Sequence, residues 1–68
     1  MKVIYDAATD VLRFVFRDAI VEDFNEDRPD VQLDYDTNDN LVAIEIHNAS
    51  KMIENPRSLE HIVLNEST

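Results

Sequence analysis

The 68-residue chain contains no cysteine and no glycine. The absence of cysteine excludes a disulfide framework and a cysteine-rich zinc site. The absence of glycine excludes the phosphate-cradling loop of nucleotide-binding proteins. It also excludes the glycine elbow that presents a catalytic serine, so neither Ser50 nor Ser58 is expected to act as a nucleophile. The composition therefore indicates no cofactor, and none is predicted.

Long apolar runs are also missing. No stretch approaches the ~20 apolar residues that cross a bilayer. The first residues, Met1 to Asp6, lack the apolar core of a signal peptide. We therefore expect a soluble, cytoplasmic protein that does not bind membranes.

Positive charge is scarce. The chain has 6 Lys and Arg against 15 Asp and Glu, which gives a net charge of −9. Nucleic acids and anionic membranes are bound through clusters of Lys and Arg, whereas the cations here are scattered from Lys2 to Arg57. We expect the protein alone to bind no nucleic acid. A basic protein partner or a cation is compatible with this charge.

The length predicts a single small domain over residues 1–68. A ~60-residue domain buries only about 60% of the surface of its unfolded chain and is marginally stable by itself. Without a disulfide or a metal, self-association is the remaining source of apolar burial. We therefore expect a homodimer, with two-fold symmetry as the default.

Alternation of apolar and polar residues dominates the first two thirds of the chain and is typical of half-buried strands. It predicts strands over residues 3–5, 11–17, 31–35 and 42–47, and a less regular strand over 19–24. The connections between them are short, which favours antiparallel neighbours in a β-meander. The predicted core side chains are Leu12, Phe14, Phe16, Leu33, Ile44 and Ile46.

The pattern changes after His47. Residues 48–54 show no alternation and begin with Asn48, a candidate helix N-cap, so they predict a short helix that ends before Pro56. The segment 57–64 fits either a helix or a last strand, and the spacing of its apolar residues favours the helix. The complete prediction is an α+β, mainly β fold. It consists of a small antiparallel sheet of four to five strands with a short C-terminal helical segment.

Two groups of apolar residues are predicted to form the dimer interface. Val11 and Val15 lie on the outward face of their strand, where a strand that faces water would rarely carry two valines. A second group follows Ile46, is too large to leave in water, and must cover either this chain's own sheet or that of a neighbour. It contains Met52, Ile53, Leu59, Ile62, Val63 and Leu64. We expect the interface to be built by β-strands or by the segment after Ile46, with residues 57–68 as a dimer-contacting arm.

One cluster matches a cation-binding pattern. The cluster matches four positions of a calcium-binding EF-hand loop, namely one, three, five and twelve. They are occupied here by Asp34, Asp36, Asn38 and Glu45. In an EF-hand these positions supply the hard oxygen ligands that calcium prefers. Position six carries Asp39 instead of glycine, and the flanking residues alternate like strands. The favoured interpretation is an acidic β-hairpin without a metal. A calcium or other cation site at these four residues is the alternative.

The remaining polar residues predict structure rather than catalysis. Asp6 and Asp10 flank the first turn and are expected to cap its backbone. His47 and His61 have no local third metal ligand, so we expect them to be exposed or at an interface. No catalytic residue is predicted, and an enzyme with its active site at a dimer seam near His47 is a lesser alternative.

Three sequence elements resemble a known family. They are Tyr5-Asp6-x-x-x-Asp10-x-Leu12, then Val31-x-Leu33-Asp34-Tyr35-Asp36, and then Leu41-Val42-Ala43-Ile44-Glu45-Ile46 running into Asn48-Ala49-Ser50-Lys51. Over residues 2–53 the chain resembles the domain-of-unknown-function 2283 (DUF2283) family of small prokaryotic proteins. It departs from the family pattern at Asp39 and Ala43, where the family usually carries glycine.

The resemblance implies a small antiparallel sheet with a short C-terminal helix. It implies no activity and no catalytic residues, because the family has none assigned. It also leaves open an antitoxin-like role as the partner of a small protein. The residues and the resemblance together predict a non-enzymatic interaction module that self-associates.

Overall fold

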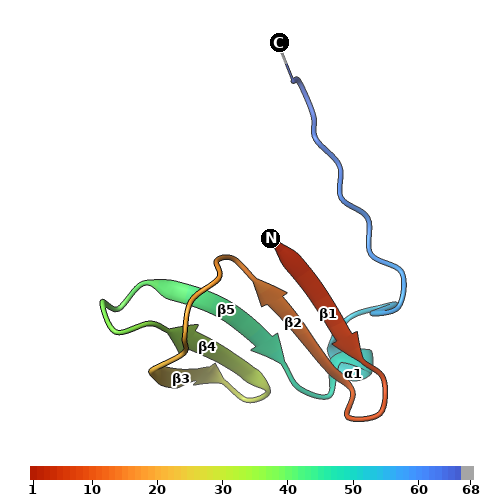
Figure 1. The fold of residues 1–68 in the computed structure, drawn as a ribbon. Helices are drawn as coiled ribbons and strands as arrows, with labels where there is room; N and C mark the ends of the chain where they lie inside the picture. The colour runs from red at the N-terminus through yellow and green to blue at the C-terminus, as the bar shows by residue number, and fades with distance from the viewer. Residues whose placement is uncertain (67–68) are drawn as a thin grey trace.

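The computed structural model describes residues 1–66, which form one sheet and one short helix (Figure 1). The elements are β1 (Lys2–Asp6), β2 (Val11–Val15), β3 (Asp23–Arg28), β4 (Val31–Tyr35), β5 (Leu41–Ile46) and α1 (Ala49–Met52). The prediction of a mainly β, α+β fold with a small antiparallel sheet is confirmed.

The strand order is β1-β2-β5-β4-β3, and every pair of neighbours is antiparallel. A simple meander would place β2 beside β3. Here residues 16–22 instead lead the chain across the end of the sheet to its far edge, so that β2 pairs with β5 (Figure 1). The physical reason is burial. The two strands richest in apolar residues occupy protected positions inside the sheet, and the polar strand β3 forms an edge.

The position of β3 corrects the sequence analysis. The sequence predicts a strand over 19–24, whereas the strand is Asp23–Arg28 and all six of its residues are exposed. Both faces of this edge strand are exposed to solvent, so its sequence does not alternate between apolar and polar residues. The period of two therefore could not locate the strand. The apolar residues that suggested the earlier position, Ile20 and Val21, lie in the exposed linker.

The turns form without glycine. The backbone adopts left-handed conformations at Asp10, Asp30, Asp39 and Asn48, with φ between 52° and 69°. Asp and Asn are the residues other than glycine that tolerate this region best. Their side chains also bind the turn backbone, as predicted for Asp6, whose Oδ1 accepts a hydrogen bond from the amide of Ala8 at 3.0 Å.

The helix α1 is shorter than the predicted 48–54 and is capped differently. Asn48 precedes it but makes no side-chain cap. The cap comes from Asp10 in the β1–β2 turn, whose Oδ1 accepts from the Ser50 amide at 3.0 Å and whose Oδ2 accepts from the Ser50 hydroxyl at 2.7 Å. The Asp10 carbonyl also accepts from the Ala49 amide at 2.9 Å. Asp10 therefore joins the first hairpin to the helix across 40 residues of sequence.

The segment 57–64 is neither a helix nor a strand, so the preference for a helix there was wrong. It runs as an extended chain away from the sheet (Figure 1). A short helix is stable in water only when packing supports it, and the apolar side chains of this segment are exposed. We call residues 57–66 the arm. Residues 67 and 68 of the predicted 57–68 segment lie outside the described residues.

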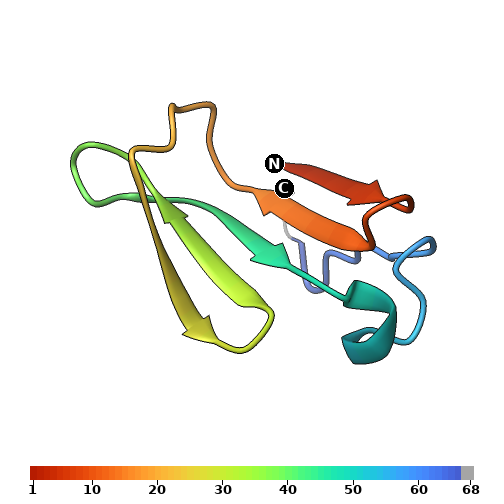
Figure 2. The same ribbon diagram turned by 90° about the horizontal axis from the view of Figure 1, so that it is seen from below.

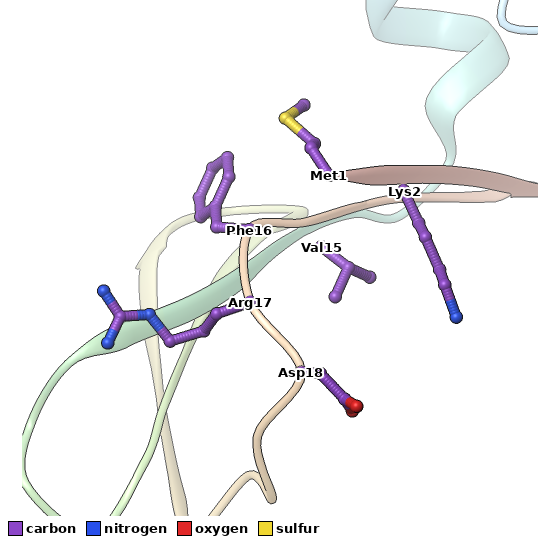
Figure 3. Close-up of a pocket in the computed structure, with 6 residues that line it drawn as sticks. All are labelled: Met1, Lys2, Val15, Phe16, Arg17 and Asp18. Atoms are coloured by element: carbon purple, nitrogen blue, oxygen red, sulfur yellow. The ribbon is translucent and has the colours of Figure 1, made fainter.

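The core is small because the sheet is a single layer with α1 beside one end (Figure 2). Among the predicted core residues only Leu12 is fully buried, Phe16 is 40% exposed and the other four are half-buried. Four further residues, Val42, Ala43, Ala49 and Asp34, are also at most 1% exposed. One face of the sheet, here called the apolar face, carries Val3, Leu12, Phe14, Phe16, Leu33, Ile44 and Ile46. Figure 3 shows that Phe16 projects to the same side of the sheet as α1.

Candidate functional site

The opposite face carries a group of polar side chains at the centre of the sheet. The charged cluster, as we call it, consists of Arg13, Gln32, Asp34, Glu45 and His47. Directly opposed residues of neighbouring strands share a face, and the register opposes Glu45 to Arg13 on one side and to Gln32 on the other. Three adjacent strands therefore bring these side chains together.

Two carboxylates form the centre of this cluster and share the same partners. The Gln32 amide donates from Nε2 to Asp34 Oδ1 at 2.8 Å and to Glu45 Oε2 at 3.0 Å. The Arg13 guanidinium lies 3.7 Å from Asp34 Oδ2 and 3.9 Å from Glu45 Oε2. His47 Nε2 lies 3.8 Å from Glu45 Oε1 at the rim of the cluster.

Burial makes the pair of carboxylates electrostatically unusual. Asp34 is 1% exposed, and its Oδ2 has no hydrogen-bond partner among the described residues. A separation of 3.7 Å from Arg13 is an ionic contact and too long for a hydrogen bond. The hydrogen bond with Asp34 raises the pKa of Glu45, and burial raises it further. A carboxyl group that lies beside a second acid and is partly withdrawn from water is harder to ionise, which is the physical cause of this raised pKa.

The predicted calcium ligands are only partly brought together. Asp34 and Glu45 both belong to the charged cluster, but Asp36 and Asn38 lie in the β4–β5 turn. There Asp36 Oδ1 accepts from the amides of Asn38 and Asn40 at 2.9 Å each. These contacts, led by those from Asn40, lower the pKa of Asp36. Within residues 1–66, no three His, Cys, Asp or Glu side chains are grouped as a metal site requires.

The other residues considered in the sequence have structural contacts. Asp10 accepts from the Tyr5 hydroxyl at 2.7 Å in addition to capping α1, and the contact with Ser50 is the main cause of its lowered pKa. His61 lies on the exposed arm. The roles of Arg13 and Gln32 were not predicted from the sequence. Their outward positions on alternating strands could be predicted from the sequence. The contact of their side chains with Asp34 and Glu45 could not, because it depends on β2 lying beside β5.

A hollow of about 240 Å³ lies where β1 begins and β2 ends. Figure 3 shows its lining residues. Lys2 and Val15 project to one side of the sheet, while Met1 and Phe16 project to the other. The charged and apolar groups of this hollow therefore do not converge on one point.

These features define a small protein built on one antiparallel sheet, with a charged cluster on one face and an incompletely covered apolar face on the other. The model of the family described as proteins of unknown function (DUF2283) matches residues 2–50, and the chain belongs to this family. The resemblance identified from the sequence is thereby confirmed. No curated protein and no solved structure matches the chain. Of the residues described, none lies in a helix long and apolar enough to cross a membrane.

Proposed function

We propose that the protein is a non-enzymatic interaction module that forms a homodimer through its apolar face. The observation that carries the proposal is the incomplete cover of this face. Leu12 is buried at the end near α1, but Phe16 and Val3 are 40% and 48% exposed. A large apolar patch on a small protein is typical of an interaction surface.

The size of the molecular surface supports the same proposal. The accessible surface is 5479 Å², whereas a folded monomer of 7.9 kDa is expected to expose roughly 4,400 Å². The radius of gyration is 13.5 Å, against about 11 Å for a compact domain of this length. The excess of roughly 1,000 Å² is comparable to the ~800 Å² that each partner buries in a standard interface.

The test is the mass in solution. Sedimentation equilibrium at tens of micromolar protein should give about twice the monomer mass of 7.9 kDa. A single species at the monomer mass would overturn the proposal. The apolar face would then be available to a different partner, such as the small protein that an antitoxin-like role requires.

A pair of variants connects the dimer to the apolar face. Phe16→Glu places a charge on this face and should raise the dimer dissociation constant at least tenfold, because the charge would lose its water on association. Phe24→Glu is the matched control. Phe24 is also exposed, but it pairs with Asp34 and therefore lies on the face of the sheet that carries the charged cluster. Equal effects of the two variants would show that the dimer uses another surface.

A further inference from the structure

The arm is apolar, exposed and anchored only at its beginning. Pro56 is buried, and the Arg57 guanidinium lies 5.9 Å from the centre of the Tyr5 ring, a distance typical of a cation–π contact. Within the described residues, the last backbone hydrogen bond along the chain runs from the Ser58 amide to the Asn55 carbonyl. Beyond it the apolar side chains are between 43% and 77% exposed; they are Leu59, Ile62, Val63 and Leu64.

A groove suited to such a segment lies on the apolar face. It has a volume of about 350 Å³ and is lined by Met1, Val3 and Phe14 from the sheet and by Leu59, Glu60 and His61 from the start of the arm. The chain's own arm forms one wall of the groove and then continues beyond it. Its next three residues, 62–64, extend away from the sheet (Figure 1). They therefore leave the groove of their own chain unfilled.

We infer that residues Ile62–Leu64 of a second copy occupy this groove, and that the exchange is reciprocal. The inference rests on the proposed homodimer and names its contact. An extended chain advances ~3.3–3.6 Å per residue, so residues 62–64 reach past their own groove toward a neighbouring sheet. In a two-fold pair each arm can enter the other subunit's groove, which is the self-complementary arrangement of an isologous dimer.

The exchange also accounts for two features of the molecule together, the partly covered apolar face and the exposed apolar residues of the arm. The apolar face is only partly covered at the end away from α1, and residues 62–64 of the arm extend away from the sheet on which they could pack. The two have matching apolar character, and neither can complete the other within the same chain because the arm has already turned away from the sheet. A second copy supplies both complements with no further partner.

Disulfide trapping tests the contact directly, because the natural chain contains no cysteine. Val3→Cys and Val63→Cys chains are mixed, one of them labelled with ¹⁵N, and oxidised under mild conditions. The mixed disulfide is then measured by mass spectrometry. Ile4→Cys replaces Val3→Cys as the matched control, since Ile4 is 47% exposed and adjacent to Val3 but faces the opposite side of β1. We expect the Val3 pair to cross-link at least fivefold faster than the Ile4 pair.

A second pair of variants tests the energetics in the full chain. Ile62→Glu should raise the dimer dissociation constant at least tenfold. Ile20→Glu adds the same charge to an exposed isoleucine on the linker between β2 and β3, and it should leave the constant unchanged. Circular dichroism establishes that both variants keep the fold.

The possible outcomes separate this inference from the proposed function. A dimeric natural protein with equal cross-linking of the Val3 and Ile4 pairs, or with no response to Ile62→Glu, would overturn the arm exchange and leave the dimer intact. Rapid Val3-to-Val3 cross-linking without any Val3-to-Val63 product would indicate direct packing of two sheets and would also overturn it. A monomeric natural protein would overturn both.

Discussion

The two faces of the sheet differ in how completely one chain can satisfy them. On the charged face, Gln32 and Arg13 each contact both Asp34 and Glu45, so within residues 1–66 only Asp34 Oδ2 among the carboxylate oxygens they approach is left with an ionic contact and no hydrogen bond. On the apolar face, the four-residue helix α1 lies beside one end, and near Met1 and Val3 the start of the arm forms only one wall of a groove. Hydrogen bonds and ionic contacts can be completed by single side chains, whereas covering a sheet requires a second layer. A chain of 68 residues has little length left to build that layer.

The largest expected effect lies where the apolar face is completely buried. Leu12→Ala should lower the free energy of unfolding by about 2–5 kcal/mol, because the fully buried Leu12 side chain would be replaced by a cavity. Urea denaturation followed by circular dichroism, at one fixed protein concentration, measures the change. Ile4→Ala on the exposed side of β1 is the control and should cost within about 0.5 kcal/mol. Similar losses for both variants would contradict the idea that the core is confined to the covered end of the face.

On the charged face, the largest effect should come from removing the cation. Arg13→Met leaves two adjacent carboxylates, one of them fully buried, without their positive partner. We expect a loss of about 1–3 kcal/mol in the free energy of unfolding, the usual penalty for an unsatisfied buried polar group. Arg17→Met makes the same change outside the cluster and should have little effect. If the two arginines prove equivalent, the cluster contributes nothing specific to stability.

A smaller effect should appear in the pH dependence of stability. The pKa of Glu45 is raised in the folded protein above its ordinary value of 4.5, mainly by its hydrogen bond with Asp34. Its contribution to stability is therefore complete below pH 4.5 and is lost as the pH rises through the folded pKa. Arg13 and His47 act in the opposite direction by attracting the charged form.

Glu45→Gln provides the measurement of that contribution. The amide imitates the protonated acid, so the variant should be more stable than the natural protein at pH 7, and the difference should shrink toward pH 4.5. Urea midpoints at pH 4.5, 5.5 and 7 decide the point. A difference that grows as the pH falls would contradict the raised pKa of Glu45.

The contrast between the faces also explains what the sequence could predict. Alternation identified β2, β4 and β5 and assigned their faces correctly, because one side of each strand is apolar. It could not locate β3, which is wet on both sides, or the neighbour of β2, which is fixed by long-range pairing. The charged cluster depends on that pairing, so its members could be named as outward residues but not assembled. The prediction of a helix over 57–64 was wrong, because the spacing of apolar residues cannot show whether the folded protein offers a surface on which that helix could pack.

The smallest expected effect is that of calcium, and it tests the remaining alternative for the charged face. Asp34 and Glu45 are held by Gln32 and Arg13, while Asp36 is held by the amides of its own turn. Calcium would have to displace Arg13 and open the turn to collect all four predicted ligands, so we expect 1 mM calcium to leave the melting temperature within about 1 °C of its value in chelator. A site with a dissociation constant of about 10 µM would instead add about 2.7 kcal/mol at that concentration. In a domain of this size such a gain raises the melting temperature by roughly 10 °C or more. A shift of that magnitude, abolished by Asp36→Asn, would establish the cation site and require the β4–β5 turn to rearrange around the ion.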